Sequence, residues 1–234
     1  MNAGSDPRLK FRESPNFNPR PTPIIDTLVL HYTGMKSAEA ALDRLCDPAA
    51  EVSAHYVVEE DGTVWNLVPE DMRAWHAGES YWRGRRNLND VSIGIEIVNP
   101  GHEFGYRDFP AAQMSAVTEL CLAIVGRHPI PARNVVAHSD IAPMRKQDPG
   151  EKFDWQELAK NGVGLWPADD KAAHYSPDPE SLRSALIKIG FDPDVRLRAV
   201  IKAFQRHWSP AAITGNPDPR TASQLLALSA MLPE

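Results

Sequence analysis

The chain has 234 residues, of which 42% are hydrophobic, and its formal net charge is -6. This length suffices for one substantial hydrophobic core and a small second one. The acidic balance argues against nucleic acid bound through a phosphate-neutralising surface, because that mode of binding needs clustered Lys and Arg. The basic run Arg83-Gly84-Arg85-Arg86 is too short to change this expectation. We interpret it as a solvated loop, with contact to an anion or a substrate as the alternative.

Cysteine content and segment hydropathy bear on the compartment. Cys46 and Cys121 are the only cysteines, so the sequence contains no disulfide framework. No run of residues reaches the length of a membrane span, and residues 1–7 lack the basic and apolar segments of a secretory signal. We therefore expect a cytoplasmic protein, with the periplasm as the alternative if an export signal was removed.

The first half of the chain predicts an extended arm followed by strands. Residues 1–25 are rich in Pro and Asn and favour an arm with little regular structure. Residues 24–32 form a β-rich run that places His31 near the end of a strand. Ser37 is expected to cap a helix that runs to about Leu45. Two β-rich segments within residues 54–68 meet at Asp61-Gly62, which predicts a two-residue hairpin turn in which both residues have positive φ.

The middle of the chain alternates loop, strand and helix. A long polar loop separates the hairpin from residues 91–99, where Ile93, Ile95 and Ile97 share one face of a strand. Glu96 lies on the opposite face, which is otherwise lined by small residues. Helical spacing predicts a helix over residues 110–126, and residues 134–138 predict a short strand. Asp154-Trp155-Gln156-Glu157 resembles a capping box that begins another helix. The fold class is therefore α/β, with a central sheet flanked by helices.

The composition changes after Trp166-Pro167, and residues 169–179 read as a linker. The preceding residues 1–168 form the predicted larger domain. Residues 180–234 form a predicted small C-terminal domain of three helices, at about residues 180–189, 195–206 and 220–231.

Two histidines and an aspartate have the pattern of an open zinc site. His31 and His138 each end a predicted strand, and Asp148 follows His138 in a turn that can place its carboxylate over the strand end. Two imidazoles and one carboxylate are three protein ligands, the number that a catalytic zinc ion takes while a fourth position stays open for water. We expect one Zn²⁺ ion. His55 is a competing ligand but is expected to pack in the core, and Asp140 could replace Asp148. The other histidines considered, none with a partner at useful spacing, are His102, His128, His174 and His207.

Six motifs occur in order around these residues. They are Leu30-His31-Tyr32-Thr33, Ser53-Ala54-His55-Tyr56, Ala74-Trp75-His76-Ala77-Gly78, Ile93-Gly94-Ile95-Glu96, Ala137-His138-Ser139-Asp140-Ile141-Ala142-Pro143 and Lys146-Gln147-Asp148-Pro149-Gly150. Together they resemble the zinc-dependent N-acetylmuramoyl-L-alanine amidases, over roughly residues 14–166. The resemblance implies a mixed central sheet flanked by helices, a fold that also resembles peptidoglycan recognition proteins.

The resemblance also implies roles for individual residues. The metal ligands correspond to His31, His138 and Asp148, and the catalytic acid/base pair corresponds to Glu96 and Lys146. Independently of the resemblance, a carboxylate such as Glu96 can pass a proton from zinc-activated water to the leaving amine. Residues i and i+2 of an extended segment project to one side, so Lys146 can reach an oxyanion near Asp148. The residues that we expect to contact the substrate are Tyr32, Trp75, His76, Asn99 and Arg107.

The C-terminal segment has a weaker signature. Residues 186–191 and 200–208, with Gly215, Asp218 and Thr221, resemble the peptidoglycan-binding domain at the ends of many wall enzymes. Phe204 and Trp208 share one helix face, a spacing that favours core packing over a platform for glycan.

These inferences predict an enzyme that hydrolyses the amide between N-acetylmuramic acid, or its 1,6-anhydro form, and L-alanine of peptidoglycan stem peptides. Its partners are then peptidoglycan fragments, with no membrane span and no obligate protein partner. The alternatives are a peptidoglycan sensor without catalytic activity and a phage-type lytic amidase. The retention of all three expected ligands together with Glu96 and Lys146 disfavours the sensor.

Overall fold

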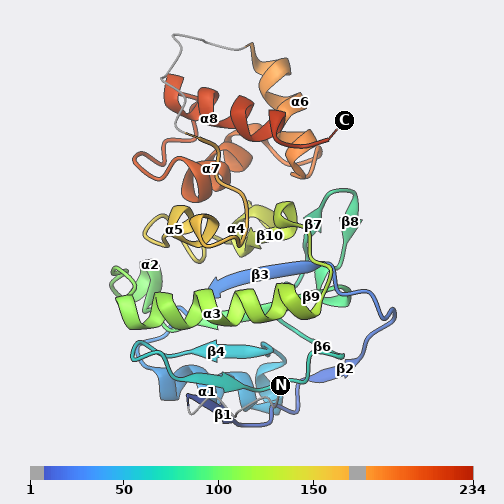
Figure 1. Ribbon diagram of the computed structural model, residues 1–234, viewed down its shortest axis with the longest axis vertical. Helices are drawn as coiled ribbons and strands as arrows, with labels where there is room; N and C mark the ends of the chain where they lie inside the picture. The colour runs from blue at the N-terminus through green and yellow to red at the C-terminus, as the bar shows by residue number, and fades with distance from the viewer. Residues whose placement is uncertain (1–7, 169–177, 234) are drawn as a thin grey trace.

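The computed structural model describes residues 8–168 and 178–233. Its centre is a six-stranded sheet with the strand order β1-β5-β4-β9-β3-β10 (Figure 1). Strands β4, β9, β3 and β10 are parallel to one another, whereas β5 is antiparallel to β4. The sheet is therefore mixed, as the sequence predicted. The strands are β1 (Leu9–Phe11), β3 (Thr27–Tyr32), β4 (Tyr56–Val58), β5 (Val64–Asn66), β9 (Ser92–Ile97) and β10 (Val135–Ala137).

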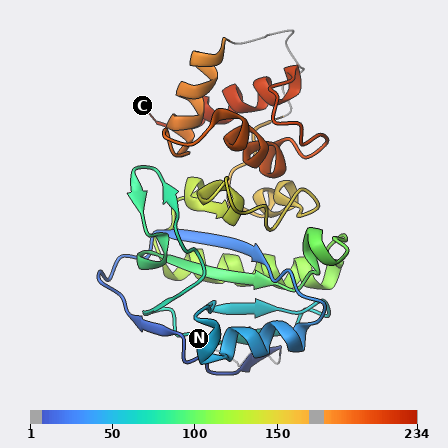
Figure 2. The same ribbon diagram turned by 180° about the vertical axis from the view of Figure 1, so that it is seen from behind.

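Helices cover both faces of this sheet. The long helix α3 (Ala111–Arg127) packs on the face that carries Ile93, Ile95 and Ile97, in the cluster that also contains Val117. On the other face, α1 (Ala38–Cys46) packs against β4, as Figures 1 and 2 show from opposite sides. The Ser37 side chain caps α1 as predicted, because its oxygen accepts from the Ala40 N–H. The alternation along β9 thus places Glu96 on the face away from α3.

The N-terminal arm is more regular than the sequence predicted. Strand β1 extends the central sheet beside β5, and β2 (Phe17–Pro19) pairs with β6 (Met72–Ala74). The expectation of little regular structure was wrong. Strands at the edge of a sheet pair through backbone hydrogen bonds, and this pairing does not require alternating hydrophobic residues in the arm. Residues 1–7 of the predicted arm lie outside the described residues.

The turn at Asp61-Gly62 also differs from the prediction. Gly62 has a φ of +89°, but Asp61 is not among the residues with positive φ. The Gly62 N–H donates to the Glu59 carbonyl, and the Glu59 N–H donates to the Thr63 carbonyl. The loop therefore has three residues, a type in which only the glycine needs the left-handed region.

The three C-terminal helices form as predicted. They are α6 (Pro179–Ile189), α7 (Leu197–Trp208) and α8 (Pro219–Ala230), and they lie beyond the β10 edge of the sheet (Figure 1). Their buried side chains, including Leu186 and Phe204, join Val29 and Val136 of the sheet in one hydrophobic cluster. Residues 169–177 of the predicted linker lie outside the described residues, so the domain boundary stays a prediction.

The basic run of residues 83–86 contacts these C-terminal helices. It lies in the hairpin of β7 (Tyr81–Trp82) and β8 (Arg85–Arg86), where the Arg83 N–H donates to the Gly190 carbonyl at 2.8 Å. The Arg83 guanidinium donates to the Ile189 carbonyl, and Arg86 forms an ion pair with Asp192. The interpretation as a merely solvated loop was therefore wrong, because this run attaches the C-terminal helices to the rest of the chain.

Short helices complete the fold. Those near the carboxyl ends of the strands are α2 (Gly101–Phe104), α4 (His138–Ile141) and α5 (Trp155–Lys160). Single 3-10 turns are η1 (Pro48–Ala50), η2 (Leu88–Asp90) and η3 (Ala132–Asn134). Among residues 8–168 and 178–233, no helix combines the length and the hydropathy needed to span a bilayer.

Candidate active site

The site lies at the carboxyl ends of three parallel strands. His31 is the penultimate residue of β3 and pairs in register with Glu96, the penultimate residue of β9. His138 follows β10 directly and begins α4. Because the carboxyl ends of parallel strands meet at one edge of a sheet, the three side chains come together there.

The loop after α4 returns Asp148 to the same point. The Ser139 N–H donates to the Asp148 carbonyl at 3.0 Å, and the Lys146 N–H donates to the Ala142 carbonyl at 3.0 Å. These backbone bonds fold residues 142–148 into a compact loop, so that Asp148 lies next to His138 although ten positions separate them.

His31, His138 and Asp148 form a buried cluster with the composition of a metal site. The Nδ1 atoms of the two imidazoles lie 2.8 Å apart, and Asp148 Oδ2 lies 3.2 Å from His31 Nδ1 and 2.9 Å from His138 Nδ1. Their donor atoms all lie within 4.8 Å of one another. The structure thus brings together the three ligands that the sequence predicted.

The surroundings of the cluster suit it to a cation. His138 Nε2 donates to the Ala77 carbonyl at 3.1 Å, which leaves the Nδ1 lone pair of the neutral ring for a metal ion. Burial and the neighbouring His138 lower the pKa of His31 to about 4, so His31 is neutral near pH 7. Burial alone would raise the pKa of Asp148, but the adjacent His138 and His31 hold that pKa well below its usual value. The site therefore offers the neutral His31, the Nδ1 atom of His138 and one carboxylate, a set that fits a divalent metal ion.

His76 lines the catalytic cleft and also contacts His31. Its side chain is 8% exposed, and its Nδ1 lies 3.0 Å from His31 Nε2. Its Nε2 lies 3.2 Å from the Ser92 hydroxyl. A Cβ atom at Gly94 would lie 2.4 Å from His76 Cγ, so the glycine makes room for this ring. His76 was expected to contact substrate, and we propose that it positions His31.

His55 is fully buried on the other side of His76. Its Nδ1 accepts from the Gly94 N–H at 3.0 Å, and its Nε2 donates to the Met72 carbonyl at 3.1 Å. The Arg20 guanidinium also lies 3.0 Å from His55 Nε2 and donates to the Ser92 carbonyl. Burial and the nearby Arg20 lower the pKa of His55 to about 3. The packing role expected for His55 agrees with these contacts, whereas the contribution of Arg20 was missed because the arm gave no pattern.

Glu96 has the environment of a carboxylate that exchanges protons. Its Oε2 atom is buried and has no hydrogen-bond partner among the described residues. Burial and the charge of Asp148 raise its pKa well above the usual value, while Lys146 opposes that rise. A carboxyl group with a raised pKa is suited to accept a proton near neutral pH.

A cleft of about 350 Å³ opens over the cluster and is lined by Glu96, His138, Lys146 and Asp148. Three of the expected substrate contacts, Tyr32, Trp75 and His76, also line it. The Tyr32 hydroxyl lies 3.0 Å from His102 Nδ1, and the Trp75 indole donates to Asn18 Oδ1 at 2.7 Å. Both aromatic rings are therefore held in place at the wall of the cleft.

Asn99 and Arg107 do not line this cleft. Asn99 is 1% exposed, and its side chain donates to the Arg107 carbonyl and accepts from the Gly101 N–H. The Arg107 guanidinium forms an ion pair with Glu60 on the surface. Their expected contact with substrate is therefore not supported by the arrangement of the side chains.

Asp140, the alternative ligand, is not part of the cluster and makes two other contacts. Its Oδ2 atom accepts from the Ala137 N–H at 2.8 Å and from His207 Nδ1 at 2.6 Å. The His207 ring stacks between Trp155 and Trp208. His102 and His128 pair with Glu151 and Glu70, and His174 lies outside the described residues.

The family follows from a sequence match over this site. Residues 20–151, more than half of the chain, match the Amidase_2 family, described as N-acetylmuramoyl-L-alanine amidase. The chain belongs to this family. All five predicted metal-binding and catalytic residues fall within the matched range.

Two curated amidases of Escherichia coli are close relatives in sequence. N-acetylmuramoyl-L-alanine amidase AmiD is 40% identical over 231 residues, which cover 88% of this chain and 83% of AmiD. The 1,6-anhydro-N-acetylmuramyl-L-alanine amidase AmpD is 38% identical over 160 residues, which cover 61% of this chain and 85% of AmpD. The match to AmiD extends beyond the family region into the C-terminal helices.

Solved amidase structures share the whole fold. Escherichia coli AmiD, in complex with the substrate anhydro-N-acetylmuramic acid-L-Ala-D-gamma-Glu-L-Lys, superposes with a TM-score of 0.80 at 39% identity. That match covers 94% of this amidase and 93% of AmiD. AmpDh3 of Pseudomonas aeruginosa gives a TM-score of 0.83 at 33% identity and covers both chains completely. The predicted fold class and the predicted enzyme family are therefore confirmed.

Proposed function

We propose that this amidase uses one Zn²⁺ ion to hydrolyse the amide between N-acetylmuramic acid, or its 1,6-anhydro form, and L-alanine of a peptidoglycan stem peptide. The observation that carries the proposal is the convergence of His31, His138 and Asp148 under a cleft that is also lined by Glu96, whose buried Oε2 atom has no hydrogen-bond partner among the described residues. The bond is suggested by the relatives, since AmiD was solved with an anhydromuramyl tripeptide as its substrate.

Zinc is the metal that suits the donor set. His31 and His138 would each give an Nδ1 atom, and Asp148 would give a carboxylate oxygen, which leaves the cleft side open. When bound, zinc supplies a Lewis acid that polarises a carbonyl and lowers the pKa of water. The bonds of His138 to Ala77 and of His31 to His76 hold the two rings in the orientation that this role needs.

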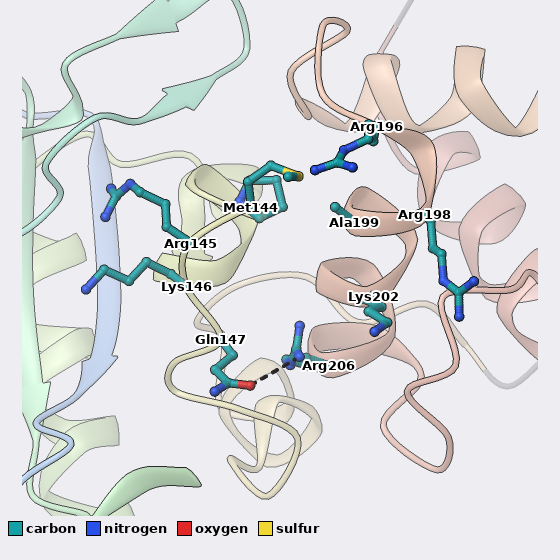
Figure 3. Close-up of a pocket in the computed structure, with 10 residues that line it drawn as sticks. Met144, Arg145, Lys146, Gln147, Arg196, Arg198, Ala199, Lys202 and Arg206 are labelled. Carbon is teal, nitrogen blue, oxygen red and sulfur yellow. Dashed lines mark hydrogen bonds between the residues drawn. The ribbon is translucent and has the colours of Figure 1, made fainter. Parts of the chain in front are cut away.

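Glu96 and Lys146 carry the proton transfers and charge stabilisation of the proposed reaction. Glu96, with its raised pKa, accepts a proton from the attacking water and returns it to the nitrogen of the leaving L-alanine. The Lys146 side chain extends from its loop toward β3, as Figure 3 shows, and lines the cleft. Its ammonium group stabilises the negative charge that develops on the carbonyl oxygen of the scissile amide.

Mass analysis of digested substrate tests this function. We expect purified, zinc-loaded protein to release L-Ala-D-γ-Glu-L-Lys from the anhydromuramyl tripeptide and to lose this activity in a chelator. Added zinc should restore the activity after the chelator is removed. Unchanged substrate with the zinc-loaded protein would overturn the proposal.

We also propose the cytoplasm as the site of action, with peptidoglycan fragments as substrates. Cys46 and Cys121 are both free, which suits a reducing compartment. Fractionation of cells that express the full-length gene, followed by immunodetection, tests this. Recovery of the protein from the periplasm or the membrane would contradict it.

A further inference from the structure

A second cavity lies beside the catalytic cleft. It has a volume of about 470 Å³ and lies between the loop of residues 143–147 and α7 (Figure 3). We call it the basic groove, because cationic side chains and no carboxylate line it. Its lining includes six cationic side chains, those of Arg145, Lys146, Arg196, Arg198, Lys202 and Arg206.

Carboxylates influence two of these cations from beyond ion-pair distance, Glu151 acting on Arg206 and Glu96 on Lys146. Among the described residues, no carboxylate forms an ion pair with any of the six. Three of them contact neutral oxygens instead. Arg145 donates to the Ala77 carbonyl at 2.7 Å and to the Glu79 carbonyl, whereas Arg206 donates to the Gln147 side chain and Arg198 to the Thr214 carbonyl, each at 3.4 Å. The burial of Arg206 lowers the pKa of its guanidinium, which means that burial disfavours the charged form of this side chain.

Repulsion between like charges along α7 also disfavours this cluster of cations. Arg198, Lys202 and Arg206 follow one another at intervals of four residues, which places three positive charges on one helix face. Like charges at this spacing destabilise a helix by about 0.2 to 0.5 kcal/mol for each pair. In a chain with a net charge of -6, such a local excess of cations is the property of a surface that binds an anion.

The groove and the catalytic cleft share one wall. Arg145, Lys146 and Gln147 line both. In Figure 3 the Arg145 and Lys146 side chains extend toward β3, whereas Arg196, which directly precedes α7, extends toward Met144 across the groove. A substrate chain that occupies the cleft therefore lies directly across this loop from the cations of α7.

We infer that the basic groove binds free carboxylates of peptidoglycan stem peptides. This inference rests on the proposed function. In the tripeptide L-Ala-D-γ-Glu-L-Lys the γ-linkage leaves the glutamate α-carboxylate free, and the chain end adds a second one. Guanidinium and ammonium groups bind carboxylates through charge-assisted hydrogen bonds. The carboxylates come either from the far end of the peptide being released or from a neighbouring stem on the same glycan strand.

Calorimetric binding tests the inference without turnover. The ligand is L-Ala-D-γ-Glu-L-Lys, compared with the same peptide in which both carboxylates are amides. The Arg196→Glu/Lys202→Glu variant should bind the acidic peptide at least about tenfold more weakly than wild type and bind the amide equally. The matched control is Lys188→Glu/Arg220→Glu, which makes the same change in net charge at exposed positions of α6 and α8 outside the groove.

Kinetics with two substrates identify the source of the carboxylates. A higher KM of the groove variant on a single muropeptide, with kcat unchanged, assigns them to the peptide being cut. A higher KM only on a glycan strand with several stems assigns them to a neighbouring stem. The inference is overturned if both variants match wild type in binding and KM, or if a short DNA duplex binds the groove more tightly than the acidic peptide. A failure of the proposed function is distinct, because it leaves wild type without turnover on either substrate.

Discussion

Gly94 leaves space for a histidine ring on the face of β9 that also carries Glu96. The absent Cβ lets His76 lie against the sheet and reach His31 Nε2 at 3.0 Å. The contact between His76 and His31 therefore depends on the missing side chain of Gly94. Such supporting contacts are commonly worth 10- to 100-fold in metal affinity.

We predict that Gly94→Ala weakens zinc binding by about 10-fold or more and costs about 1 to 3 kcal/mol of stability. The added methyl group would lie 2.4 Å from His76 Cγ, so the ring must move away from His31. Competition with a chromophoric chelator measures the affinity. Gly126→Ala in α3 is the matched control, since a Cβ there meets no atom within 4 Å. Wild-type zinc affinity in Gly94→Ala would refute the role given to His76.

At the scale of elements, Glu70 joins the end of α3 to β4. Its carboxylate accepts from the Tyr56 hydroxyl at 2.8 Å and from Arg127 at 2.6 Å, and it lies 2.7 Å from His128 Nε2. Burial opposes ionisation, but the bonds from Arg127, His128 and Tyr56 outweigh it and lower the pKa of Glu70 to about 2. The folded state therefore favours the ionised carboxylate.

This depressed pKa predicts a pH-dependent loss of stability. Because the pKa falls from 4.5 to about 2 on folding, the stabilisation is complete above pH 4.5 and is lost as the pH falls through 2. Glu70→Gln should cost about 1 to 2 kcal/mol at pH 7, a value reduced from the full shift because solvent partly screens the carboxylate. Urea unfolding of both proteins between pH 7 and pH 2.5 measures the difference. A difference that stays constant over this range would contradict the assignment.

Elements with strong periodicity were predictable from the sequence, and contacts between distant segments were not. The strand that carries His31 near its end and the alternation around Glu96 depend on local hydrophobic pattern, which the sequence displays directly. The position of His76 depends on how a polar loop folds over β9, and no local pattern encodes that. The contact of Arg83 with Gly190 likewise joins residues far apart in the chain.

At the scale of the whole molecule, the C-terminal helices contact the short helix that carries one of the proposed metal ligands. His207 of α7 contacts Asp140 of α4, the same short helix that begins with His138. Both partners of this pair are at most 1% exposed, and the His207 ring stacks on Trp155 and Trp208. The sequence predicted three helices but assigned His207 no partner, because sequence spacing does not show which helix lies against which.

We predict that His207→Ala destabilises the whole protein by about 1 to 3 kcal/mol, since it leaves the buried Asp140 carboxylate with the Ala137 N–H but without the His207 hydrogen bond. Calorimetry should show a single unfolding transition at a lower temperature, because the C-terminal helices and the sheet share one hydrophobic cluster. In a double-mutant cycle, Asp140→Ala/His207→Ala should lose less stability than the sum of the two single changes. Additive losses, or two separate transitions, would contradict this coupling.

The central claim is that Glu96 acts on water at a zinc site that it does not itself ligate. Zinc content and turnover of Glu96→Ala, measured on one preparation beside His31→Ala, test it most directly. We predict that Glu96→Ala retains about one zinc per chain and loses turnover by at least about 100-fold, whereas His31→Ala loses both. Near wild-type turnover in zinc-loaded Glu96→Ala would contradict the claim.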